Sequence, residues 1–182
     1  MNKRAFTIIE ILVVVGIIAI IAAIAFPAFM AQTERAHVDE MRSQLGILDA
    51  ALSQYHTRLG DYPLSFGTGD NAGIETMLAA LRSKTDGGPF IQEHLIQRWL
   101  SDTDGDGKQE LADPWGTPWI YFHPASYTSG VASHRSEERT FGAEPVKKRG
   151  VFLNLTKYQL WACGPNGVNE SGDSDDVGNL VK

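Results

Sequence analysis

The chain opens with a segment that is apolar on every side. Residues 11–31 (ILVVVGIIAIIAAIAFPAFMA) contain no charged side chain, and about 20 such residues are what an α-helix needs to cross a bilayer. Lys3 and Arg4 precede this run, and positive charge holds its flank of a membrane helix in the cytoplasm. We therefore expect a single pass through the inner membrane, with a cytoplasmic N-terminus and everything after about residue 31 outside that membrane.

An amphipathic pattern continues the helix beyond the membrane. A helix from Phe6 to Leu59 would be about 80 Å long. Its later half carries one apolar stripe, formed by Met41, Leu45, Leu48, Leu52, Tyr55 and Leu59. A stripe at this spacing indicates burial against the protein's own globular domain more often than an oligomer seam. Pro27 predicts a kink or a melted turn, while Gly60 and Pro63 predict the end of the helix.

The remaining sequence predicts short helices and a small sheet. Apolar periodicity indicates helices at 74–81 and within 91–100, and runs of aromatic and β-branched residues indicate strands at 119–123, 158–163 and, as a third, 151–155. Residues 125–149 are polar and without period, which predicts a long surface loop. A sheet of this size needs a partner, so we expect it to pack on the helix stripe in an α+β fold.

Composition and charge exclude several functions. The net charge is −6, and residues 147–149 form the one Lys/Arg cluster after the N-terminus, so we expect no nucleic-acid binding by the isolated subunit. The single cysteine, Cys163, cannot form an intramolecular disulfide and is expected to be a buried small residue. The sequence contains no zinc-ligand spacing, nucleophile elbow, P-loop or dinucleotide motif. We therefore expect no catalytic function.

Glu10 is the one charged residue within the run FTIIEILVVVG. A carboxylate at the centre of a membrane helix costs about 2.5–3.5 kcal/mol on insertion scales. Two explanations remain open. Glu10 could lie at the headgroup level, where the cost is small, or it could pair with a cation that a neighbouring subunit supplies.

Residues 3–30, with this basic leader, phenylalanine, glutamate and apolar run, resemble the N-terminus of type IV prepilins and of the pseudopilins of type II secretion. The resemblance implies that a prepilin peptidase cleaves between Ala5 and Phe6 and that the new amine is methylated. It also implies that Glu10 pairs with the amine of an adjacent subunit and that Pro27 is the helix-bending proline. The family usually has glycine before the cut, whereas this chain has Ala5.

An acidic segment has the spacing of a calcium-binding loop. In residues 102–113 (DTDGDGKQELAD) carboxylates occupy positions 1, 3, 5, 9 and 12, with glycine at position 6, as in an EF-hand loop. The predicted Ca²⁺ ligands are Asp102, Asp104, Asp106, the carbonyl of Lys108, and Asp113, which stands where glutamate is usual. Pro114 prevents a normal second helix. The alternative is a solvated acidic turn.

The C-terminal segment, residues 163–180, resembles the Ca²⁺ loop of the major pseudopilin of type II secretion. Residues 36–63 and 113–121 resemble further parts of that family. The resemblance implies a second Ca²⁺ site, with the Cys163 carbonyl, Asn166, Asp175 and Asp176 as ligands. The family typically has aspartate at the position of Asn166, so one negative charge fewer is available. Without the resemblance, such a loop would be interpreted as plain turns.

Together these features predict a type IV pilin-like protein in four parts: leader 1–5, membrane and filament-core helix 6–31, amphipathic helix 32–60, and periplasmic globular domain 61–182. We expect a structural subunit of a type II secretion pseudopilus, a periplasmic filament that promotes protein export. Its expected partners are copies of itself, other pseudopilins, prepilin peptidase and inner-membrane secretion components. The alternatives are a type IV pilus subunit for adhesion, motility or DNA uptake, and a membrane-tethered calcium-binding module that does not polymerise.

Overall fold

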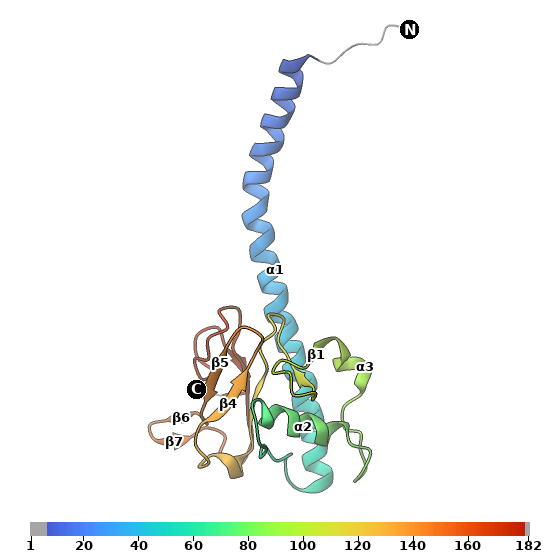
Figure 1. The fold of residues 1–182 in the computed structure, drawn as a ribbon, viewed down its shortest axis with the longest axis vertical. Helices are drawn as coiled ribbons and strands as arrows, with labels where there is room; N and C mark the ends of the chain where they lie inside the picture. Colours follow the sequence, from blue (N-terminus) through green and yellow to red (C-terminus); the bar gives the residue numbers. More distant parts are fainter. Residues whose placement is uncertain (1–6, 181–182) are drawn as a thin grey trace. The chain divides into compact units, whose positions relative to one another are not determined.

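The computed structural model describes residues 7–180, so the predicted cleavage site between Ala5 and Phe6 lies outside the described residues. The chain divides into two compact units, Met1–His37 and Val38–Lys182. Helix α1, Ile8–Leu59, contributes residues to both units (Figure 1).

In the first unit, α1 begins with a capping box. The backbone N–H and hydroxyl of Thr7 both donate to Oε2 of Glu10, at 2.8 Å each, and Thr7 Oγ1 accepts from the Glu10 N–H. These bonds satisfy donors that the first helical turn leaves unpaired. The apolar side chains that follow are exposed, and α1 is long and apolar enough to cross a membrane.

The helix runs through Pro27 without interruption. The predicted melted turn is therefore wrong. Proline removes a single hydrogen bond from the ladder, and the bonds of the flanking turns keep the backbone helical. The predicted end of the helix is confirmed: Gly60 has φ 84° and its N–H donates to His56 O at 2.8 Å.

In the second unit, the later half of α1 buries most of its predicted stripe. Met41, Leu48 and Leu52 are fully buried and Leu45 and Tyr55 are partly buried, whereas Leu59 is exposed. The stripe shares one core with helix α2 (Ala72–Arg82), which buries Ile74, Met77, Leu78 and Leu81. Helix α3 (Glu93–Ile96) and the short helix η1 (Gln97–Trp99) confirm the predicted turns within residues 91–100.

A three-stranded antiparallel sheet forms the centre of this unit, in the order β3 (Ile120–Phe122), β8 (Gln159–Ala162), β9 (Val177–Gly178). Successive side chains of a strand point to opposite faces of the sheet, so the two faces contribute to two separate cores. Tyr121, Leu160 and Ala162 join the core of α1 and α2, while Ile120, Phe122, Trp161 and Cys163 join a second core with Tyr127 and Ala143. The predicted α+β fold is confirmed.

The third strand of that sheet is β9 and not residues 151–155, so that prediction is wrong. In that segment β7 (Val151–Phe152) pairs with β6 (Lys147–Lys148) in a separate hairpin. Asn154 then adopts φ 55°, a left-handed conformation that ends the strand.

The predicted surface loop at residues 125–149 is also partly wrong. After the short helix η2 (Pro124–Ser126), strands β4 (Ala132–Arg135) and β5 (Thr140–Ala143) form an antiparallel hairpin (Figure 1). The hairpin is held by the second core, because His134 stacks on Phe141 with ring centroids 5.6 Å apart and lies beside Phe122. Because the hairpin is rich in polar residues, its sequence did not predict this packing.

Candidate metal sites and relationship to known proteins

The acidic loop joins strands β1 (Leu100–Ser101) and β2 (Glu110–Leu111), which pair antiparallel. Gly105 and Gly107 take φ values of 80° and 89°, which only glycine adopts without cost. The carboxylate of Asp102 stabilises the turn of the loop, because it accepts hydrogen bonds from the N–H groups of Gly105 at 2.7 Å and Gly107 at 3.0 Å. Asp102 is thus used within the loop.

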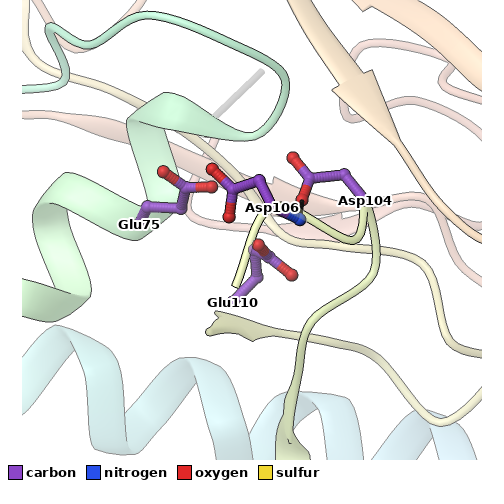
Figure 2. A group of neighbouring side chains, drawn as sticks. All are labelled: Glu75, Asp104, Asp106 and Glu110. Carbon is purple, nitrogen blue, oxygen red and sulfur yellow. Dashed lines mark hydrogen bonds between the residues drawn. The ribbon is translucent and has the colours of Figure 1, made fainter. Parts of the chain in front are cut away.

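Four carboxylates converge where this loop meets helix α2. One oxygen each of Glu75, Asp104, Asp106 and Glu110 lies within 4.8 Å of the others, and Figure 2 shows the four side chains around a common point. Asp104 and Asp106 are predicted ligands. The spacing of the loop places Glu110 at position 9 but does not predict it as a ligand. The sequence does not predict Glu75 either, because no local pattern joins it to the loop.

The two glutamates of this group are buried. Glu75 is 6% exposed and Glu110 is 0% exposed. Glu110 Oε2 accepts from the Thr103 N–H at 2.7 Å and from its hydroxyl at 3.0 Å. Burial raises the pKa of Glu110 to about 7, against the opposing effect of the Thr103 hydrogen bonds. This carboxylate is therefore costly to ionise unless a cation compensates it.

Lys108 supplies the positive charge of the group. Its Nζ lies 2.5 Å from Asp106 Oδ2 and 2.7 Å from Glu75 Oε2, and hydrogen bonds to Asp106 and then Glu75 raise its pKa above the usual value. The predicted role of Lys108 was through its carbonyl, whereas the structure places its ammonium group among the carboxylates.

Asp113 is not a member of this group. Its Oδ1 accepts from the N–H groups of Trp115 at 3.0 Å and Thr117 at 2.9 Å, which fixes the turn at residues 113–117. Burial raises its pKa to about 6. The structure therefore does not bring Asp102 and Asp113 together with Asp104 and Asp106.

The C-terminal loop brings two of its predicted residues, Asn166 and Asp175, into contact. Asp175 accepts from the Asn166 side-chain amide at 2.7 Å and from the Asn166 N–H at 3.1 Å. Asp176 Oδ2 accepts from the N–H groups of Gly172 and Glu170. Its Oδ1 is buried, and among residues 7–180 it has no hydrogen-bond partner. Burial and the nearby charge of Glu170 raise the pKa of Asp176 to about 7.

Cys163 is the first residue of this C-terminal segment and is buried in the second core. Burial raises the pKa of its thiol, and the charges of Asp176, Asp113 and Glu170 add to the effect. An uncharged thiol is a poor nucleophile, and the full burial of the side chain confirms the expectation that Cys163 is a buried small residue.

Comparisons with known proteins place the chain in a family. Residues 1–26 match the prokaryotic N-terminal methylation motif, and residues 28–139, more than half of the chain, match type II secretion system protein G. No solved structure matches the chain significantly.

Three curated relatives are each named type II secretion system core protein G. The Escherichia coli protein is 26% identical over 98% of this chain and 91% of its own length. The Pseudomonas aeruginosa protein is 33% identical over 69% and 77%, and the Klebsiella pneumoniae protein 23% over 98% and 94%. These matches favour the secretion filament over a type IV pilus or a tethered module. The chain belongs to the type II secretion system protein G family and is a structural subunit of the type II secretion pseudopilus.

Proposed function

We propose that this pseudopilin enters the inner membrane with Lys3 and Arg4 in the cytoplasm and its globular unit in the periplasm. Prepilin peptidase then cleaves between Ala5 and Phe6, and the new amine is methylated before assembly with copies of itself and other pseudopilins. The match of residues 1–26 to the methylation motif carries this proposal. The proposed role is structural, without catalysis and without nucleic-acid binding by the isolated subunit.

The mass of the protein recovered from membranes of its native host tests the processing step. A mature chain that begins at Phe6, with or without one methyl group, is the expected result. Ala5→Gly should be processed at least as fast as the wild type, because glycine is the usual residue there, and Ala5→Leu should accumulate unprocessed. An intact N-terminus in the wild type would contradict the proposal.

We propose further that Glu10 binds the amine of an adjacent subunit during assembly. Thr7 occupies Oε2 of Glu10, and among residues 7–180 no group donates to Oε1. Glu10→Gln should therefore insert into the membrane normally but fail to assemble into filaments, as measured by chemical cross-linking between subunits. Glu34→Gln, at an exposed position of the same helix, is the matched control and should assemble. Normal assembly of Glu10→Gln would reject the pairing.

For the C-terminal loop we propose a Ca²⁺ site with the Cys163 carbonyl, Asn166, Asp175 and Asp176 as ligands. The buried Oδ1 of Asp176 supports it, because a buried carboxylate oxygen without a partner is costly. Bound Ca²⁺ would compensate these charges and hold the loop that carries β9. Asp176→Asn should weaken Ca²⁺ binding by about tenfold or more, measured by calorimetric titration of the full chain in detergent. Unchanged binding would contradict this assignment.

A further inference from the structure

The acidic group beside helix α2 has the composition of a cation site. Glu75, Asp104, Asp106 and Glu110 contribute four carboxylates, and their oxygens lie within 4.8 Å of one another (Figure 2). Oxygens around one Ca²⁺ ion at about 2.4 Å are at most about 4.8 Å apart, so the spacing of the four carboxylates is compatible with one shared ion. An all-carboxylate set favours hard cations over zinc or copper.

Acidic clusters are common on protein surfaces, but two oxygens of this one are buried and unsatisfied. Glu75 Oε1 and Glu110 Oε1 have no hydrogen-bond partner among residues 7–180, on side chains that are 6% and 0% exposed. Lys108 binds the other oxygen of Glu75, and Thr103 binds the other oxygen of Glu110. Lys108 and Thr103 therefore leave the Oε1 atoms of both glutamates without a hydrogen-bond partner, and such groups are costly to bury.

We propose that Glu75, Asp104, Asp106 and Glu110 bind one Ca²⁺ ion, and that Lys108 is an internal competitor that moves out when the ion binds. This ligand set differs from an EF-hand. The carboxylates at loop positions 1 and 12, Asp102 and Asp113, instead accept backbone hydrogen bonds. A side chain of helix α2 replaces them.

The consequence of this ligand set is a bridge between two elements. Glu75 belongs to α2, whose Ile74, Met77 and Leu78 pack in the main core, while the other ligands belong to the β1–β2 loop and to β2. A cation at this point would fix the loop to the core of the globular unit. The inference goes beyond the filament role, because it concerns residues of the second unit alone.

The test uses the full chain in detergent, stripped of metal, and titrated with CaCl₂ by calorimetry. Asp176→Asn serves as the background, since it weakens the proposed C-terminal site by about tenfold or more. In that background one Ca²⁺ site should keep its affinity. Adding Glu75→Gln or Glu110→Gln should weaken it by about tenfold or more, and Glu144→Gln, at an exposed residue outside the group, should leave it unchanged.

Lys108→Met provides a variant with the opposite sign. Because it removes the competing ammonium, Ca²⁺ should bind about tenfold more tightly or better. If Glu110→Gln fails to fold, judged by circular dichroism without metal, Glu75→Gln and Asp106→Asn carry the test. The proposal is overturned if Asp176→Asn alone binds no Ca²⁺, or if Glu75→Gln leaves the remaining site intact. Unaltered Ca²⁺ affinities and stoichiometry in Asp176→Asn alone would instead reject the C-terminal site.

Discussion

The indole N–H of Trp119 donates a 2.7 Å hydrogen bond to Oε1 of Gln44, and both side chains are almost fully buried. The two residues lie 75 positions apart in the sequence. The bond joins the later half of α1 to the segment that enters the central sheet. Gln44 Nε2, by contrast, has no partner among the described residues, so the amide is only half satisfied.

This pair predicts a measurable coupling. Gln44→Leu should destabilise the protein by about 1 kcal/mol, because it leaves the indole N–H unpaired while relieving the unsatisfied Nε2. Gln44→Leu combined with Trp119→Phe should cost less than the sum of the single changes, with a coupling of roughly 0.5–3 kcal/mol in urea unfolding. Gln54→Leu, on the exposed face of α1, is the control. Strict additivity would show that the bond contributes nothing.

Two glycines in helices should respond oppositely to alanine. A Cβ on Gly73 of α2 would lie 2.6 Å from the carbonyl oxygen of Tyr121, whereas a Cβ on Gly46 of α1 would meet nothing within 4 Å. Gly73→Ala should therefore destabilise by roughly 1–3 kcal/mol, despite the better helix propensity of alanine. Gly46→Ala should stabilise by about 0.5–1 kcal/mol. Thermal unfolding in detergent measures both, and a stabilised Gly73→Ala would contradict the close approach of α2 to β3.

His134 should make stability depend on pH. It is 1% exposed, and burial lowers its pKa to about 4, below the value of about 6.5 in the unfolded chain. Between these values the unfolded state binds more protons. The contribution of His134 is therefore present above pH about 6.5 and is lost as the pH falls toward 4, by about 3 kcal/mol at most.

His134→Phe isolates this contribution, because it preserves a ring beside Phe141 and removes the titration. The difference in unfolding free energy between the wild type and the variant should shift against the wild type as the pH falls from 7 toward 4. Other acidic groups titrate equally in both proteins and cancel in the difference. A difference that is constant with pH would show that His134 is accessible to protons in the folded state.

Cys163 should resist thiol reagents in the folded protein. It is fully buried and burial raises its thiol pKa, so both access and the thiolate form are suppressed. N-ethylmaleimide should label no thiol in the native wild type and one in urea, as measured by mass spectrometry. Ser129→Cys, at an exposed position, should gain one native label. Rapid labelling of the native wild type would mean that the second core opens.

Local patterns predicted the elements whose burial follows a period. The stripe on α1 and the buried face of α2 have helical spacing, and β3 and β8 are aromatic-rich runs, so each could be predicted from neighbouring residues. The β4–β5 hairpin could not, because it is held by the stacking of His134 on Phe141, and histidine carries no strand signal. Strand β9 is equally hidden, since Gly178 is needed only for the close approach of Leu160 O.

The ligands of the acidic group could likewise be predicted only where they lie close together in the sequence. The spacing of the acidic loop indicated Asp104 and Asp106, which the structure does bring together. It could not indicate Glu75, whose partner Lys108 lies 33 positions away, nor that Asp102 and Asp113 are used in turns. Ligands that come from one loop can be predicted from their spacing in the sequence. A ligand that a second element contributes can be identified only once the packing of the two elements is known.

The capping box at the start of α1 also has a consequence for subunits that have not yet assembled. Because Thr7 donates twice to Oε2 of Glu10, a subunit that has not yet assembled already satisfies one oxygen of this carboxylate within its own helix. With Oε1 left for an incoming amine, joining the filament would add a bond to Glu10 without first breaking one.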